Sequence, residues 1–560
     1  MRYMDLYNEW TTNLYFDENT RRELKNIKNN TKEIQERFYK NLEFGTAGLR
    51  GIIGAGANRI NDYTVARATF GLANYIIKNV GEKGKNRGVV IAHDSRYKSR
   101  EFCTQAANTL AACGIKAYIF DSLRTTPELS YAVRSLNCIA GIVITASHNP
   151  PEYNGYKVYG EDGAQVMPDI ANKITEEINK IQDYSKIPTI NESQKHLIVM
   201  LDEEQDTKFI EAVKQQFIGT NIEKDLKIVY TPLCGTGNKP IKRVLNEVGF
   251  KNILVVKEEE YPDPNFAGIK YPNPEDKKAL ERAIILAKKE DADLVIATDP
   301  DCDRVGIAVK TSIGKYELLT GNQIGALLVD YVLSNLESKN SIPENSTIIK
   351  TIVTSELGAR VAKSYGVDCL NVLTGFKFIG DKIKEFEMTN ENNFIMGFEE
   401  SYGYLIGTHA RDKDGVVSSM LIADMTSYWK SRGMNLYDAL LNLYKKHGYF
   451  IEDMISISLS GIEGIKKIEK IMNDFRINNL TEITNIKTLE VKDYEKGIDG
   501  LPKSNVLKFI LEHDSWIAIR PSGTEPKLKV YIGICGENME SLESEILNIK
   551  KNIEKRIKLL

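Results

Sequence analysis

Two short stretches of the sequence carry side chains whose types and spacing suit chemistry on a charged group. In the first, Ser147 lies among small and polar residues in Thr-Ala-Ser-His-Asn-Pro, residues 145–150, with His148 beside it. A serine with a neighbouring base is one arrangement of an activated nucleophile. The alternative is a strand-to-loop turn that a serine caps, and the stretch taken alone favours the turn. The Gly-x-Ser-x-Gly elbow of α/β-hydrolases is absent from this stretch.

The second stretch holds three aspartates at alternate positions. Asp299, Asp301 and Asp303 follow a strongly apolar run. In an extended loop, side chains two residues apart point to one side, which suits a hard cation with oxygen ligands. Three crowded carboxylates without a cation would repel one another, so metal binding is favoured over a solvated acidic turn. An EF-hand loop would need Gly and Glu where Arg304 and Lys310 stand, so a calcium-sensor loop is excluded.

Three further loops combine glycine with polar side chains. Residues 397–403 place a carboxylate and a hydroxyl two residues apart between glycines, which suits sugar hydroxyls, although a simple turn cap is the alternative. Residues 520–526 join an arginine to a glycine flanked by hydroxyl residues, which favours a phosphate cradle over an ordinary turn. Residues 44–51 form a small-residue loop with one arginine, where the backbone can approach a ligand closely.

The composition argues against several classes of protein. The 560 residues carry 74 basic and 77 acidic side chains, a net charge of −3, so no overall field favours nucleic acid or a membrane surface. No apolar run approaches the length of a membrane span, and the first residues lack the apolar segment of a signal peptide. The seven cysteines form no Cys-x-x-Cys pair, which is typical of a reduced, cytoplasmic protein without structural zinc.

Strands and helices alternate along most of the chain, and they must position these loops. After a helical lead-in over residues 1–40, the pattern predicts mostly parallel sheets covered on both faces, in three tandem α/β units. From about residue 449 strands outnumber helices, and an amphipathic helix over about 538–558 closes a smaller α+β unit. The expected strands are 88–92, 117–120, 139–145, 226–231, 253–256, 294–298, 347–352 and 394–398. The expected helices are 100–112, 127–136, 239–248, 274–288, 322–336 and 356–365.

Taken together, the five loops resemble the α-D-phosphohexomutase superfamily. FGTAGLRG, TASHNP, DPDCDR, GFEESYG and RPSGTEP occur in this order and span nearly the whole chain. They are most similar to phosphoglucomutase/phosphomannomutase members of the larger bacterial type, which also resemble mammalian phosphopentomutase. The resemblance implies three tandem mixed-sheet α/β domains of similar topology and a smaller C-terminal α+β domain, around a central cleft. It implies domains with phosphoserine, metal-binding, sugar-binding and phosphate-binding loops at 1–205, 206–318, 319–447 and 448–560, respectively.

The resemblance also implies roles for the residues that react. Ser147 matches the family's phosphoserine, and its phosphate would complete the coordination of Mg²⁺. The matching metal ligands are Asp299, Asp301 and Asp303. Arg304, Lys157 and Arg50 match basic residues around the reacting phosphoryl group. Lys157 and His148 are the two candidates for taking the proton of the sugar hydroxyl, and His148 alternatively only orients the loop.

Residues that would hold the substrate follow from the same resemblance. Glu399 and Ser401 match contacts to sugar hydroxyls, with Thr374 and Gly375 in a neighbouring loop and Lys413 near the sugar. The site for the substrate's non-reacting phosphate matches Arg520, Ser522, Gly523 and Thr524.

The activity that the resemblance implies is reversible conversion of glucose 1-phosphate to glucose 6-phosphate. Phosphorylated Ser147 and a hexose 1,6-bisphosphate, which is both activator and intermediate, would carry the phosphoryl group. Residues 399–401 resemble glucose-preferring members, while a phosphomannomutase, a phosphopentomutase or a sugar bisphosphate synthase stays open. A phosphatase-like hydrolase and an inactive paralogue are alternatives of other classes, and the second predicts loss of Ser147 or an aspartate, all of which are present. The implied partner is a small-molecule sugar phosphate, with no nucleic acid or membrane, for a cytoplasmic monomer or homodimer.

Overall fold

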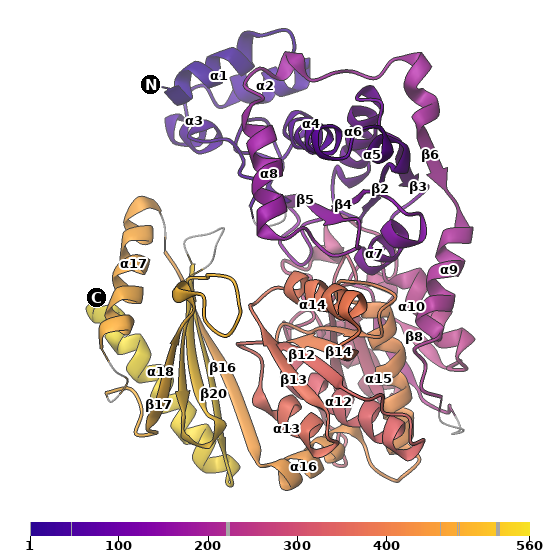
Figure 1. Cartoon of the computed structure of the whole chain (residues 1–560), viewed down its shortest axis with the longest axis vertical. Coiled ribbons are helices and arrows are strands. Elements are labelled where there is room, and N and C mark those ends of the chain that lie inside the picture. Colours follow the sequence, from indigo (N-terminus) through magenta and orange to yellow (C-terminus); the bar gives the residue numbers. More distant parts are fainter. Residues whose placement is uncertain are drawn as a thin grey trace.

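The computed structural model describes residues 2–45, 48–219, 224–459, 461–478, 480, 482–521 and 527–560. Within these residues the chain forms four β-sheets, one after another along the sequence (Figure 1). Sheets of six, five and four strands with helices on their faces form three α/β domains, and a five-stranded antiparallel sheet forms the C-terminal domain. The predicted fold class is confirmed.

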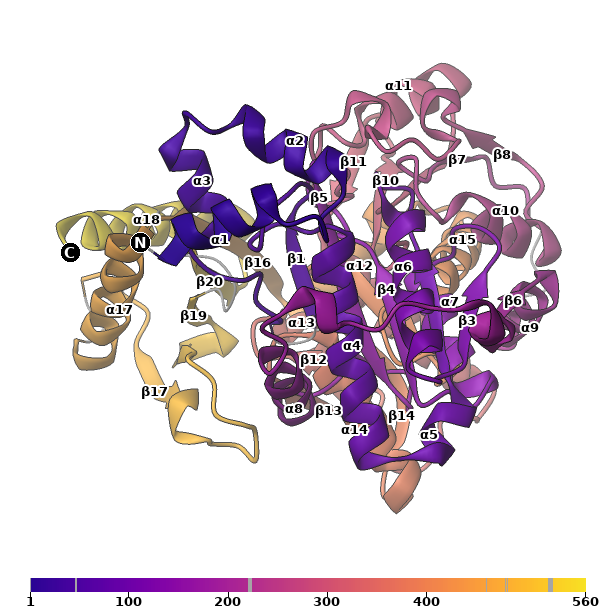
Figure 2. The same ribbon diagram turned by 90° about the horizontal axis from the view of Figure 1, so that it is seen from above.

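The first domain is built on central strands that are buried at every position, as parallel strands covered on both faces are. Three helices precede its sheet, as the sequence predicts, and they gather at one end of the domain in both ribbon views (Figures 1 and 2). The strands are β1 (Gly48–Ile52), β2 (Val89–His93), β3 (Ala117–Phe120), β4 (Ala140–Ile144), β5 (Tyr153–Gly160) and β6 (Ile198–Leu201). The helices are α1 (Arg2–Thr12), α2 (Glu18–Asn26), α3 (Thr31–Phe38), α4 (Asp62–Asn79), α5 (Glu82–Arg87), α6 (Ser99–Ala112), α7 (Thr126–Ser135) and α8 (Pro168–Asn179), with 3₁₀ helices η1 (Tyr184–Lys186) and η2 (Glu192–Leu197).

The second domain differs from the sequence prediction at one helix. The helix expected over 274–288 begins only at Glu281. The side chains of Asn273 and Asp276 accept hydrogen bonds from the backbone N–H groups of Glu275 and Lys278, and such local bonds compete with a helix. The elements are α9 (Glu203–Lys214), β7 (Ile228–Thr231), α10 (Asn238–Glu247), β8 (Ile253–Val255), η3 (Lys257–Glu259), η4 (Phe266–Gly268), α11 (Glu281–Glu290), β9 (Leu294–Thr298), β10 (Val305–Lys310) and β11 (Tyr316–Leu319).

The third domain has its longest helices capped by side chains. Thr320 and Gln323 form a reciprocal capping box at the start of α12, and Asp414 accepts from two backbone N–H groups at the start of α15. The elements are α12 (Gly321–Ser338), β12 (Ser346–Thr351), α13 (Glu356–Ser364), β13 (Asp368–Val372), α14 (Phe376–Thr389), β14 (Asn393–Glu399), β15 (Gly403–Ile406), α15 (Gly415–Lys430) and α16 (Leu436–His447).

The C-terminal domain follows α16 after the single residue Gly448, and it lies at one side of the molecule in both ribbon views (Figures 1 and 2). Its last helix is amphipathic, as the sequence predicts, because buried residues recur every three or four positions from Leu542 to Ile557. The elements are β16 (Tyr449–Ser458), α17 (Gly461–Ile477), β17 (Thr488–Asp493), η5 (Tyr494–Lys496), β18 (Leu507–Leu511), η6 (Glu512–Asp514), β19 (Trp516–Pro521), β20 (Lys527–Gly536) and α18 (Met539–Leu559).

The three α/β sheets share one strand order. It reads β5-β4-β2-β3 in the first domain, β10-β9-β7-β8 in the second and β15-β14-β12-β13 in the third. In each case three strands run parallel, and the fourth in sequence turns back antiparallel beside the third. The loops of these hairpins are residues 145–152, 299–304 and 400–402. The serine, aspartate and glutamate loops therefore occupy the same position in three related domains.

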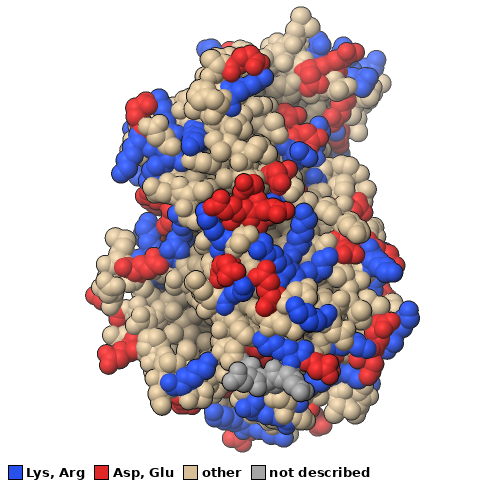
Figure 3. Space-filling view, turned by 90° about the vertical axis from the view of Figure 1, so that its right-hand side faces the viewer, with Lys and Arg blue, Asp and Glu red and all other residues tan. Residues whose placement is uncertain are grey.

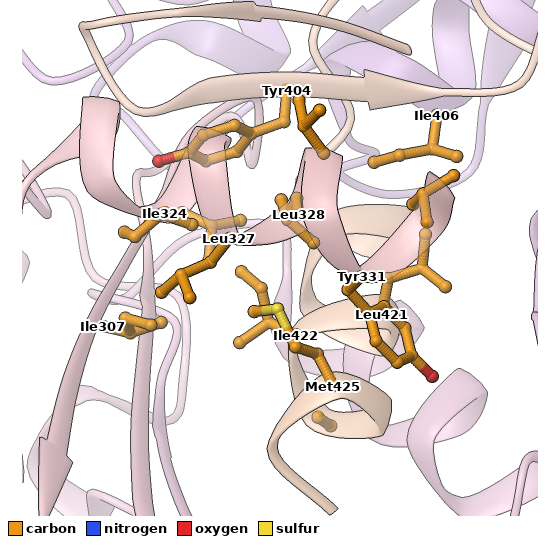
Figure 4. Packing of buried hydrophobic residues seen from close by; sticks show 14 of the residues in the cluster. Ile307, Ile324, Leu327, Leu328, Tyr331, Tyr404, Ile406, Leu421, Ile422 and Met425 are labelled. Carbon is orange, nitrogen blue, oxygen red and sulfur yellow. The ribbon is translucent and has the colours of Figure 1, made fainter. Parts of the chain in front are cut away.

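The second and third domains share one hydrophobic core. Figure 4 shows Ile307 from β10, Leu327 from α12 and Ile422 and Met425 from α15 in one cluster, together with Leu421. These side chains are almost completely buried. Burial of this kind stabilises by about 25 cal/mol per Å² of apolar surface, so these two domains are held together more firmly than polar contacts alone would allow.

The face that Figure 3 shows carries both acidic and basic side chains, with a group of acidic ones near its middle, and the net charge of the chain is −3. Among the described helices, none combines the length and the apolar character that a membrane span requires.

Candidate active site

The serine loop of the first domain meets the aspartate loop of the second. The Ser147 hydroxyl donates a hydrogen bond of 2.7 Å to Oδ2 of Asp299, although 152 positions separate the two residues. Both residues are buried. Ser147 has a φ of 52°, in the left-handed region that non-glycine residues rarely adopt. His148 places Nδ1 3.3 Å from the serine oxygen.

The three aspartates cluster as the alternating spacing predicts. Asp299, Asp301 and Asp303 each offer a carboxylate oxygen within 4.8 Å of the others, and all three are buried. Among the described residues, Oδ1 of Asp301 and Oδ1 of Asp303 have no hydrogen-bond partner. Buried oxygen atoms without a donor fit a hard divalent cation, which takes oxygen ligands.

Lysines from two other domains neutralise part of this negative charge. Lys157 of β5 places Nζ 2.8 Å from Oδ2 of Asp301, and Lys413 places Nζ 3.1 Å from Oδ2 of Asp303. Burial raises the pKa of Asp299, and the other two carboxylates raise it further. Burial also disfavours the charged form of Asp303, but Lys413 and Lys157 outweigh it and lower its pKa. The three domains therefore meet around one set of opposite charges.

Two arginines lie beside the serine. Arg304 donates its backbone N–H to Oδ1 of Asp299 at 3.0 Å, and its guanidinium pairs with the carboxylate of Glu275. Arg50 donates to Oδ1 of Asn149 in the serine loop at 3.2 Å. Burial lowers the pKa of His148, and the nearby charges of Arg304 and Arg50 lower it further, so this imidazole is neutral.

Two separate segments predicted to bind the sugar, around Glu399 and around Gly375, lie in contact. Oε1 of Glu399 accepts a hydrogen bond of 2.9 Å from the backbone N–H of Gly375, which directly precedes α14. Burial raises the pKa of Glu399, while Lys413 opposes the shift. The hydroxyl of Thr374 is buried and has no hydrogen-bond partner among the described residues. A polar atom in that state is suited to a ligand.

A cavity of about 1040 Å³ opens between the third and fourth domains and reaches the serine loop. Predicted site residues that line it are His148, Arg304, Thr374, Gly375, Glu399, Ser401, Lys413 and Arg520. Arg520 comes from β19 of the C-terminal domain. The predicted Ser522, Gly523 and Thr524 lie outside the described residues, as do Thr46 and Ala47 of the small-residue loop. The cavity lining does not include Ser147, Lys157, Arg50 or the three aspartates, and Ser147 and the aspartates are buried.

Sequence reasoning missed several polar residues that contact this site. Thr126, at the start of α7, donates its hydroxyl to Oδ2 of Asp301 at 3.0 Å and its backbone N–H to the carbonyl of Asp301 at 2.9 Å. Asp94 and Arg96 lie directly after β2 and contact the serine loop. The sequence held a signal for Asp94 and Arg96, because these two residues follow an apolar strand, and ligands bind at that edge of the sheet.

Models of one family match most of the chain. The alpha/beta/alpha domains I, II and III of phosphoglucomutase/phosphomannomutase match residues 41–185, 207–314 and 320–447, and the C-terminal domain of that family matches residues 463–543. Each match covers most strands of one of the four sheets, and β6, β11 and β16 lie outside the matched residues.

Full-length relatives agree with the family match. Phosphoglucomutase of Staphylococcus epidermidis is 38% identical over 529 residues, covering 92% of this chain and 95% of the relative, and that of Staphylococcus haemolyticus is 39% identical over 537 residues with the same coverage. The open form of parafusin, a phosphoglucomutase from Paramecium, superposes with a TM-score of 0.70 at 18% identity over 92% of this chain and 95% of its own, which shows a shared fold. The chain therefore belongs to the phosphoglucomutase/phosphomannomutase family of the α-D-phosphohexomutases and is a phosphomutase that transfers phosphoryl groups on hexose phosphates.

Proposed function

We propose that the chain interconverts glucose 1-phosphate and glucose 6-phosphate through phosphorylated Ser147 and a hexose 1,6-bisphosphate, with Mg²⁺ as its metal. The observation that carries the proposal is the 2.7 Å contact between the Ser147 hydroxyl and Asp299, which joins the loops of two domains. A serine that can carry a phosphoryl group lies beside three carboxylates that can hold a cation. The name of the staphylococcal relatives supports glucose as the sugar.

In the first half-reaction, a hydroxyl of the sugar phosphate accepts the phosphoryl group from Ser147. Phosphoryl transfer depends mainly on the placement of the reactants and on the neutralisation of charge on the transferring oxygens. Arg304 and Lys157 supply positive charge on the protein side. Mg²⁺, held by the three aspartates and the serine phosphate, would add Lewis-acid stabilisation of the same oxygens. The two candidates for taking the hydroxyl proton are His148, with Nδ1 3.3 Å from the Ser147 oxygen, and Lys157, with Nζ 2.8 Å from Oδ2 of Asp301.

In the second half-reaction, the bisphosphate turns around and returns its other phosphate to Ser147. The cavity of about 1040 Å³ leaves room for this turn, and its lining carries Arg304, Lys413 and Arg520. Glu399 and Ser401, with Thr374 and Gly375 opposite, offer hydrogen bonds to sugar hydroxyls in either orientation. Arg520, with Ser522, Gly523 and Thr524 following it in the sequence, would hold the phosphate that does not react.

We assign the four loops to domains at 1–205, 206–318, 319–447 and 448–560. The last boundary is supported by Gly448, which separates α16 from β16. The balanced surface charge and the seven cysteines, all of them free thiols, support a cytoplasmic enzyme that acts on small molecules, as a monomer or homodimer, without nucleic acid or membrane.

The test is a set of coupled assays with glucose, mannose and ribose 1-phosphates, each with and without Mg²⁺ and glucose 1,6-bisphosphate. We expect the highest kcat/KM for glucose 1-phosphate and a loss of turnover when the metal is chelated. A higher kcat/KM for mannose or ribose 1-phosphate would show that this sugar, rather than glucose, is the preferred substrate. Net formation of bisphosphate or release of inorganic phosphate would indicate a synthase or a hydrolase instead.

A further inference from the structure

The guanidinium of Arg96 is enclosed by the backbone of the serine loop. Nη2 donates to the carbonyl oxygens of Ser147 at 2.5 Å and Asn149 at 2.6 Å. Nη1 donates to the carbonyl oxygens of Pro150 at 2.8 Å and Tyr153 at 3.1 Å. The Arg96 side chain is fully buried, with an exposed fraction of 0%. One side chain thus donates to four carbonyl groups, three of them between β4 and β5 and one at the first residue of β5.

The other side of the Ser147 peptide is held by a second buried side chain. The hydroxyl of Thr145 accepts from the Ser147 backbone N–H at 2.8 Å and donates to Oδ2 of Asp94 at 2.6 Å. Asp94 also accepts from the backbone N–H of Arg96 at 3.0 Å. Asp94 and Arg96, two residues apart, therefore fix both the N–H and the carbonyl of the serine.

This fixation has a clear physical purpose, because the Ser147 backbone is strained. A φ of 52° is unfavourable for a residue with a Cβ atom and persists only where the surroundings determine it. Only an arginine offers enough donors in a planar fork to serve two pairs of carbonyls at once. A lysine at this position would carry the same charge but could not span them.

Arg96 also contacts the domain that carries the aspartates. Its guanidinium stacks on the ring of Phe266 in η4, with 4.8 Å between the guanidinium carbon and the ring centroid. Next to this contact, Asn265 donates to the hydroxyl of Tyr97 at 3.0 Å. The side chain that holds the serine loop thus lies directly in the interface between the first and second domains.

We propose that Arg96 is a positioning residue for phosphoryl transfer: it holds the Ser147 backbone in its left-handed conformation and so directs the serine oxygen toward Asp299. The proposal rests on the phosphoserine function proposed above and adds to it a residue that touches neither substrate nor metal. Arg96 affects the rate at which Ser147 gains and loses the phosphoryl group, and it leaves substrate binding unchanged.

The test compares Arg96→Lys with Arg87→Lys in the full-length protein. Arg87 is a matched control, because it also donates to two backbone carbonyls of the first domain, those of Asn137 and Cys138, away from the serine loop. The readout is the single-turnover rate at which dephosphorylated enzyme takes a phosphoryl group from glucose 1,6-bisphosphate, together with kcat, KM and the melting temperature. We expect Arg96→Lys to slow the transfer about 100-fold, with KM changed less than about twofold. We expect Arg87→Lys to transfer at the wild-type rate.

A second variant separates positioning from folding. In Arg96→Ala, added guanidinium ion at millimolar concentration is expected to restore part of the transfer rate, while methylammonium is not. Wild-type transfer in Arg96→Lys, an equal loss in Arg87→Lys, failure of guanidinium to rescue, or loss of cooperative unfolding in both Arg96 variants would each overturn the proposal. If the wild-type protein itself accepts no phosphoryl group, the proposed function fails and the role of Arg96 falls with it.

Discussion

Two groups of basic side chains lie around the cavity, and they differ in their surroundings. Arg304 and Lys413 lie next to the aspartates and form ion pairs with carboxylates. Arg520 of the C-terminal domain and Lys377 at the start of α14 lie close enough for their charges to interact, and both line the cavity. The first group suits the reacting phosphate, and the second suits the phosphate that is only held.

Arg520→Ala is expected to raise KM for glucose 1-phosphate and leave kcat nearly unchanged, because the held phosphate is bound equally in the ground and transition states. Hydrogen bonds to charged groups contribute about 1.5–3 kcal/mol, so the increase should be roughly 10- to 100-fold. Steady-state kinetics measure it. Arg476→Ala is the control, since this arginine pairs with Asp493 in the same domain and is absent from the cavity lining. A fall in kcat without a change in KM would contradict the role of Arg520.

The lowered pKa of Lys377 predicts that substrate capture depends on pH. Burial lowers its pKa to about 8, and the positive charge of Arg520 adds to the shift. The amine of the free enzyme is protonated below this pKa and neutral above it, so its attraction for a phosphate is present at pH 7 and lost as pH rises through about 8. We expect kcat/KM to fall above that pH, and we expect Lys377→Gln to remove this limb of the profile and lower the plateau at neutral pH. Identical pH profiles for the two proteins would exclude Lys377 from phosphate binding.

Among elements, the hairpin that follows the third parallel strand of each α/β sheet places the reactive loops. The alternation of apolar runs predicted β3 and β9 with their observed bounds and most other parallel strands within two residues, because strands buried on both faces are continuously apolar. In the three α/β sheets it missed β1, β6, β11 and β13. It also missed β5, β10 and β15, which turn back antiparallel beside the third parallel strand of each sheet. Those missed strands close the hairpins, so the sequence located each loop without revealing that the three loops are equivalent.

The site itself was predictable where chemistry sits in one short stretch and not where it depends on packing. The spacing of Asp299, Asp301 and Asp303 predicted their cluster. Nothing in the order of residues indicated that Thr126 at a helix start would contact Asp301, or that Glu275 would pair with Arg304. The first contact arises where the first domain packs on the second, and the other arises from packing within the second domain. No local pattern encodes either contact.

Gly155 on β5 tests how closely that strand must approach the serine loop. A Cβ atom at Gly155 would lie 2.3 Å from the carbonyl oxygen of Thr145, which is backbone and has little freedom to shift. Gly155→Ala is expected to destabilise the protein by about 1–3 kcal/mol, as overpacking does, and to reduce kcat by displacing Ser147. Gly160→Ala on the same strand is the control, because its added Cβ atom would first meet the carboxylate oxygen of Asp162 at 3.1 Å. Equal melting temperatures and equal kcat values for the two variants would contradict this explanation.

On the scale of the whole molecule, the site lies between domains rather than within one. The first domain supplies Ser147, the second the aspartates, the third Glu399 and Lys413, and the fourth Arg520. The shared core of the second and third domains fixes half of this arrangement. The fourth domain follows the third after the single residue Gly448, which has a φ of 88°, and residues of both domains form one buried cluster.

Metal binding should stabilise the assembled protein, because the three buried carboxylates repel one another without a cation. A ligand at 100 times its Kd adds about 2.7 kcal/mol to the folded state. We expect Mg²⁺ to raise the melting temperature of the wild-type protein by a few degrees and a chelator to reverse the effect, with no activity assay involved. Asp301→Asn should lose most of this response, whereas Asp291→Asn, which changes an aspartate outside the cluster, should keep it. Equal responses in both variants would place the metal elsewhere.

The most direct test of a phosphoserine mechanism is the intact mass of the protein after incubation with glucose 1,6-bisphosphate and Mg²⁺. The account predicts that dephosphorylated wild-type enzyme gains the mass of one phosphoryl group, located on Ser147 by peptide sequencing, and loses it again to glucose 6-phosphate. Ser147→Ala should gain no mass and show no mutase turnover while it melts like the wild type. A phosphoryl group on another residue, or turnover that persists in Ser147→Ala, would contradict the account.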